Sequence, residues 1–254
     1  MSRKNPRPIP LDMAQMEGVT QEIVDRLTEA AQANANLWPK QHIHDSPSME
    51  VLFRRAIFGT NVKGEPFKAQ IIVFATTSYT GGVALNDIIP LSTPDFLIRA
   101  FIGHEAFDDG RQIPIIGLGI NGYWTWGKLL KYLTKRREEA VAGIHSEIIH
   151  EMTHLRDVIK DQEKWKKKKW AHRDHEIRAI MQQIIHQVRQ KIKRQPHSMT
   201  LFNRYDFAHV LRQLSPKYRK VYADLTPEGT YIILSGVHQA LVEDGHSFER
   251  GKLK

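Results

Sequence analysis

The sequence contains no cysteine among its 254 residues. Disulfide bonds are therefore excluded, and so is every metal site that uses thiolate ligands. A tightly bound transition metal would have to use histidine nitrogens and carboxylate oxygens. The chain supplies 13 histidines and 28 acidic residues, so such a site remains open to it.

Long hydrophobic runs are also lacking. No stretch approaches the roughly 20 apolar residues that a helix needs to cross a bilayer. The basic segment Met1 to Pro8 is not followed by the apolar core of a secretory signal. We therefore expect a soluble, cytoplasmic protein, and association with a virus particle or a mobile element is an open alternative.

Negative charge is scarce relative to positive charge. The formal net charge is +9 and the isoelectric point is near 9.6, which favours contact with nucleic acid or with acidic protein surfaces. Part of the excess lies in one lysine cluster around Trp165 and before Trp170, where the tryptophans offer rings on which bases can stack. A solvated loop or helix face is the alternative interpretation. The cluster consists of Lys164, Lys166, Lys167, Lys168 and Lys169.

The order of predicted elements indicates an α+β fold. A proline-punctuated arm over residues 1–10 precedes a predicted helix over residues 11–37. Four β-branched and aromatic runs, bounded by glycine and proline, then predict strands of a twisted, mostly antiparallel sheet. Pro114 in the last run favours an edge position, because proline cannot donate to a strand ladder. The predicted strands are residues 51–58, 67–76, 96–102 and 112–120.

Helical periodicity dominates the second half of the chain. The predicted helices there are residues 140–160, 173–194, 203–214 and 227–243. We expect three domains: an N-terminal arm and helix (1–45), a core (46–195) and a helical C-terminal subdomain (196–254).

The chemical signal of the sequence is His150-Glu151-Met152-Thr153-His154. Residues four apart in a helix share one face, so His150 and His154 can bind one tetrahedral metal ion. Glu151 is displaced around the helix, where it is better placed to reach a water on the metal than to bind the metal itself. Surface histidines, or core histidines with ordinary partners, are the alternative.

This H-E-x-x-H motif on a helix that follows strands resembles the zincin metallopeptidases. The resemblance covers residues 95–190. It implies a zincin-like core, zinc bound by His150 and His154, and Glu151 as the catalytic base.

The resemblance also bears on the third ligand that a catalytic zinc needs. The metzincin branch continues with a glycine and a third histidine, which the segment after His154 lacks. Gluzincin-like enzymes take a glutamate from the next helix, and Glu176, followed three residues later by Ala179, fits that arrangement. A helix N-terminal glutamate favoured by the helix dipole is the alternative for Glu176. The other candidates for the third ligand are His175, His172 and Asp157, and Asp157 is also a candidate for orienting an imidazole.

We therefore expect a zinc-dependent peptidase in which a zinc-activated water attacks the peptide carbonyl, with Glu151 moving the proton. Residues 112–120 are the expected edge strand on which an extended substrate adds. Candidates for the donor to the oxyanion are Tyr205, His209, Tyr231 and His238.

Two other functions are compatible with the sequence. One is a non-catalytic zincin-like protein that contacts nucleic acid or an acidic partner through the lysine cluster. The other is a zinc hydrolase of non-peptide substrates, since the motif specifies water activation and not the substrate.

Overall fold

The computed structural model describes an α+β chain whose residues fall into two compact units. The N-terminal unit is Leu11–Val158, and the C-terminal unit is Ile159–Lys254 together with Met1–Pro10. The residues whose placement is described are 12–45, 51–60, 64–76, 78–80, 88–90, 98–106, 110, 112–156, 174–194 and 225–245.

The N-terminal unit is organised around a four-stranded mixed sheet with the strand order β1-β2-β6-β5. β1 and β5 run antiparallel to their neighbours, whereas β2 and β6 are parallel. The parallel pair was not expected from the sequence. Two short strands form a separate antiparallel pair. The strands are β1 (Phe53–Thr60), β2 (Pro66–Thr76), β3 (Ser78–Thr80), β4 (Ile88–Pro90), β5 (Ile98–Ala106) and β6 (Gln112–Asn121).

The expected edge position of residues 112–120 is wrong, because β6 lies between β2 and β5. Pro114 is opposite His104 of β5, but the pairing of β6 with β2 begins only at Ile115. The proline therefore lies before the point where β6 acquires its second neighbour, and its missing N–H does not exclude β6 from the interior of the sheet. The outer strand on this side is β5.

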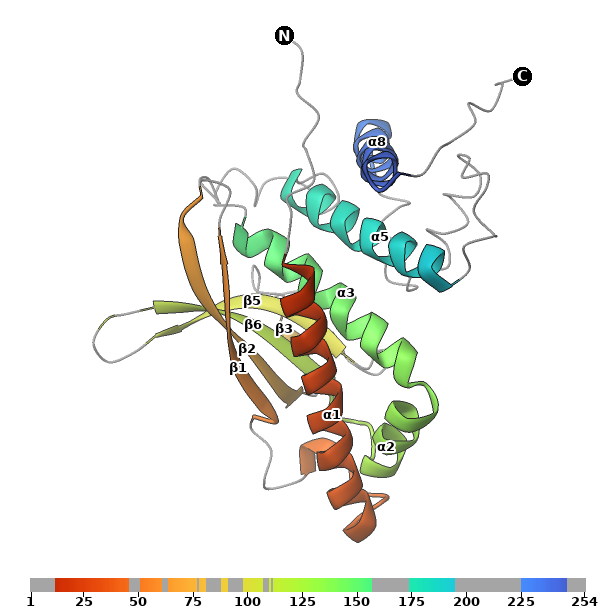
Figure 1. Cartoon of the computed structure of the whole chain (residues 1–254). Coiled ribbons are helices and arrows are strands. Elements are labelled where there is room, and N and C mark those ends of the chain that lie inside the picture. The colour runs from red at the N-terminus through yellow and green to blue at the C-terminus, as the bar shows by residue number, and fades with distance from the viewer. Residues whose placement is uncertain are drawn as a thin grey trace. The chain divides into compact units, whose positions relative to one another are not determined.

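Three helices of the N-terminal unit lie on one side of this sheet (Figure 1). α1 (Met13–Leu37) presents buried side chains at helical spacing, including Val19, Ile23 and Leu27. These side chains form one core with buried residues of the sheet, of α2 (Trp126–Lys135) and of α3 (Arg137–Arg156). Packing against β5, β6 and α1 fixes α3, the helix that carries the histidine motif.

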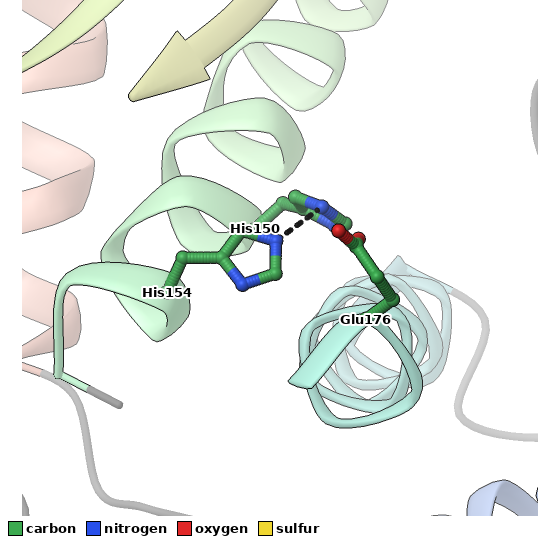
Figure 2. A group of neighbouring side chains, drawn as sticks. All are labelled: His150, His154 and Glu176. Atoms are coloured by element: carbon green, nitrogen blue, oxygen red, sulfur yellow. Dashed lines mark hydrogen bonds between the residues drawn. The ribbon is translucent and has the colours of Figure 1, made fainter. Parts of the chain in front are cut away.

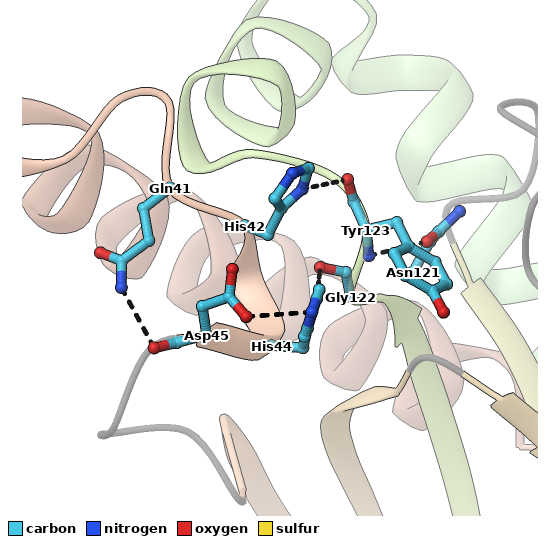
Figure 3. A network of polar contacts seen from close by, with 7 residues as sticks. All are labelled: Gln41, His42, His44, Asp45, Asn121, Gly122 and Tyr123. Carbon is cyan, nitrogen blue, oxygen red and sulfur yellow. Dashed lines mark hydrogen bonds and ion pairs between the residues drawn. The ribbon is translucent and has the colours of Figure 1, made fainter.

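The link between β6 and α2 is held by a 3-10 turn, η1 (Ile43–Asp45), and the residues before it. His42 and His44 each donate from Nδ1, since a carbonyl can only accept, to the carbonyl oxygens of Tyr123 and Gly122, both at 2.7 Å. Asp45 lies 3.0 Å from Nε2 of His44 (Figure 3). No sequence pattern predicted these contacts, which connect the segment before the sheet to the segment that leads into α2 and α3.

In the C-terminal unit, α5 (Asp174–Arg194) packs against α8 (Pro227–Glu243). The helices approach closely at Gly236, where a Cβ atom would lie 2.0 Å from the sulfur of Met181. Thr226 caps α8 by accepting from the amide of Gly229 at 3.0 Å. Their shared core consists of Ile177, Ile180, Met181, Ile184, Ile185, Val188, Ile233, Val237, Ala240 and Leu241.

The sequence-based elements match the observed ones closely at α1, β1, β2, α5 and α8. α3 begins three residues before the predicted start at residue 140. The predicted helix over residues 203–214 lies outside the described residues. The three-domain division at residues 45 and 195 stays a prediction, because compactness does not test separate folding. Among the described helices, none has the length and apolar character required to cross a membrane.

Candidate metal centre

The motif histidines lie in the last two turns of α3. His150 is 6% exposed, Glu151 7% and His154 8%. Buried imidazoles and carboxylates are costly unless they are hydrogen-bonded, paired or bound to a metal. Their shared burial on one short segment therefore indicates a built site and not a solvated helix face.

The two imidazoles converge on one another. Nε2 of His150 and Nε2 of His154 are 3.0 Å apart, and the rings meet edge to face at 84° with centroids 4.6 Å apart. Two nitrogens at roughly 2.0–2.1 Å from a tetrahedral zinc are separated by about 3.3 Å. The observed separation is close to that value, so both nitrogens face the position that one metal ion would take.

Glu176 of α5 is the third member of a group that could hold a metal ion. His150, His154 and Glu176 each offer one ligand atom, these atoms all lie within 4.8 Å of one another, and all three residues are buried (Figure 2). The three residues expected to be ligands thus form a group that can hold a metal ion. Two neutral nitrogens and one carboxylate suit zinc and other first-row divalent metals, so the donor set by itself does not fix the metal.

Glu151 follows His150 by one residue, which rotates its side chain by about 100° around the helix. The helix here is regular, and Thr153 bonds to it by donating from Oγ1 to the carbonyl of Ile149 at 2.8 Å. Thr153 therefore satisfies its hydroxyl within the helix and is not a candidate ligand. Glu151 is a buried carboxylate that follows His150 directly in sequence. It does not belong to the group of His150, His154 and Glu176.

Several sequence candidates cannot be placed at this centre. Asp157, His172 and the lysine cluster lie outside the described residues, as do Tyr205 and His209. His175 belongs to α5, but its side chain is outside the description. Tyr231 is 63% exposed on α8, and His238 is exposed on the same helix.

One buried histidine of the motif helix was missed by the sequence reasoning. His145 is 3% exposed, and burial lowers its pKa to about 4, so the imidazole is neutral at pH 7. It lies five residues before His150, or about 140° around the helix. His145 therefore does not share the face of the two motif histidines, and its spacing gave no signal for a ligand.

No family model, curated protein or solved structure matches this chain.

Proposed function

We propose that this protein is a zinc-dependent hydrolase of the zincin type that cleaves peptide bonds. The observation that supports the proposal most directly is the 3.0 Å approach of the two imidazole nitrogens of His150 and His154 on a buried helix. Without a metal this contact is a hydrogen bond in which one Nε2–H donates to the other Nε2, whereas a metal ion would use the lone pairs of both nitrogens.

The proposed ligands are His150, His154 and Glu176, which leaves a fourth position for water or substrate. A zinc ion held in this way lowers the pKa of water and polarises a carbonyl group. The protein would contribute by holding the two imidazoles on one face of α3 and by excluding bulk water through burial.

Glu151 is the proposed general base. Its carboxylate is buried on the same helical turn as the ligands, so it operates where charge is poorly screened. It accepts the proton of the attacking water and delivers it to the departing amine nitrogen. Because Glu151 is not a ligand in this scheme, its removal affects proton transfer and leaves metal binding intact.

An extended peptide substrate needs a place to bind beside the motif helix. β5 is one of the two outer strands of the four-stranded sheet, and α3 packs against it. β5 replaces residues 112–120 as the proposed strand on which substrate adds, with backbone hydrogen bonds supplying affinity.

The test pairs Glu151→Gln with the matched control Glu147→Gln, one turn earlier on α3 and half-buried. We expect Glu151→Gln to keep the zinc content of the wild type and to lose about 10²- to 10⁴-fold in kcat. Glu147→Gln should keep both. Metal content is measured by elemental analysis, and hydrolysis by mass spectrometry of a mixture of unstructured peptides.

Equal loss of activity in both glutamate variants would contradict the role of Glu151. Zinc-loaded wild type that cleaves no peptide but hydrolyses small esters would support the hydrolase and reject the peptidase.

A further inference from the structure

The four-stranded sheet has a second face that takes no part in the helix-covered core. Side chains alternate along a strand, so Ile71 and Val73 of β2 enter the core while Ile72 points to the opposite face. Ile72 is 8% exposed and yet does not belong to the core cluster. The helices α1, α2 and α3 all lie on the other side of the sheet (Figure 1).

This second face is apolar and only partly covered. Phe58 of β1 is 59% exposed, although it is a large aromatic residue within a strand. The register places Phe58 beside Lys68 and Arg54 beside Ile72, so apolar and basic side chains alternate across the face. The half-buried members of this second face are Ala56, Gln70, Phe74, Phe101, Ile113 and Ile115.

Glycine leaves room for an aromatic ring in the middle of the face. A Cβ atom at Gly117 of β6 would lie 2.3 Å from the ring of Phe101, its neighbour on β5. Phe101 therefore lies over the glycine, and Phe74 meets its ring edge to face at a centroid distance of 5.7 Å. Phe74 of β2 and Phe101 of β5 thus form a pair of adjacent aromatic rings on the second face.

Basic residues outnumber acidic ones at the register positions of this second face in the described strands: Arg54, Lys68 and Arg99 lie there with one acidic residue, Glu105. Arg54 and Lys68 are exposed, and the guanidinium of Arg54 donates to Oε1 of Gln70 at 3.0 Å, which holds it above the sheet. The chain as a whole carries a net charge of +9. A polyanion is the partner whose charge complements the face.

We propose that this sheet face binds single-stranded nucleic acid. Aromatic side chains on a four-stranded sheet stack with unpaired bases, and flanking Arg and Lys contact the phosphates; here Phe58 offers an exposed ring, and Phe74 and Phe101 offer half-buried ones. A second copy of this chain is disfavoured as the occupant, because two such faces each carry an excess of basic residues and repel one another. Nucleic-acid binding here is independent of the proposed hydrolase site.

The experiment measures fluorescence anisotropy of a labelled 20-nucleotide oligo(dT) and of oligo(U) titrated with the full chain at several salt concentrations. The variant Arg54→Glu/Lys68→Glu is compared with Lys131→Glu/Lys135→Glu, which reverses two exposed lysines on α2. Both pairs change the net charge equally and leave the lysine cluster intact. Circular dichroism verifies folding.

We expect the sheet-face pair to weaken binding at least 10-fold and to reduce the salt slope by about 1.4, or about 0.7 for each lost phosphate contact. The α2 pair should change affinity less than 3-fold. Phe58→Ala should weaken binding by about 5- to 100-fold, the effect of losing one stacked base. Tyr231→Ala, which removes an aromatic 63% exposed on α8, should have no effect.

Three results would overturn the proposal. The first is absence of binding by the wild type. The second is equal weakening by both charge-reversal pairs, which would assign binding to diffuse positive charge. The third is a dimer in solution that Phe58→Ala dissociates, which would make this face a protein interface.

Discussion

Nε2 of His150 and Nε2 of His154 lie 3.0 Å apart, one helical turn from each other in α3. Helix geometry places their Cβ atoms on one face, but it does not dictate that the nitrogens converge, because each ring can rotate about χ1 and χ2. Their convergence in a buried setting is the arrangement that a metal ion bound by both nitrogens would require.

Removing any one ligand should abolish tight zinc binding. We expect His150→Ala, His154→Ala and Glu176→Gln each to lower zinc affinity by more than about 100-fold, since loss of even an outer hydrogen-bonding partner costs about 10- to 100-fold. Competition with a chromophoric chelator measures the affinity. His238→Gln, at an exposed position of α8, is the matched histidine control and should bind as the wild type does. Wild-type affinity in Glu176→Gln would show that another residue completes the site.

Metal binding should stabilise the folded protein. At a free zinc concentration about 100 times the Kd, the free energy of unfolding should rise by about 2.7 kcal/mol relative to protein in chelator. The variant His150→Ala/His154→Ala should show no such gain. Urea unfolding with and without zinc checks this expectation, and an equal gain in both proteins would locate the stabilising metal elsewhere.

His145 should make stability depend on pH. Its pKa is about 4 in the folded protein against 6.5 in the unfolded chain, because burial disfavours the charged imidazole. Between these values the unfolded state binds more protons, so the free energy of unfolding falls as the pH drops from 6.5 to 4, by up to about 3 kcal/mol. Above pH 6.5 this contribution is fully present and constant.

The matched variant for this effect is His145→Leu. Urea unfolding at pH 4.5 and pH 7 should show a smaller loss of stability on acidification in the variant than in the wild type. All other ionisable groups are the same in the two proteins, so the difference between the two losses isolates His145. Identical losses would contradict its neutral, desolvated state.

Two helical glycines should respond to substitution in opposite directions. Gly236→Leu should destabilise the C-terminal unit by about 1–3 kcal/mol, because even a Cβ there would lie 2.0 Å from the sulfur of Met181. Gly143→Ala on α3 meets no atom within 4 Å and should stabilise by about 0.5–1 kcal/mol through helix propensity. Thermal unfolding measures both. A neutral Gly236→Leu would show that α8 does not depend on this close approach to α5.

The sequence by itself determined the features that depend on short-range periodicity. The 3.6-residue repeat predicted α1, α5 and α8 closely, and Thr226-Pro227 predicted the start of α8. The spacing of His150 and His154 placed them on one helix face for the same reason. Such features arise from interactions between residues three or four apart, and this spacing is visible in the sequence.

The tertiary structure decided what depends on distant partners. An apolar strand such as β6 can have the same sequence pattern at the edge and in the interior of a sheet. Only its pairing with both β2 and β5 makes it an interior strand. His42 and His44 gained a role because they meet carbonyls 81 and 78 residues away. The aromatic and basic second face of the sheet likewise exists only once strands far apart in the chain stand side by side. Strand order, loop contacts and exposed faces are set by the packing of the whole chain, which local periodicity does not encode.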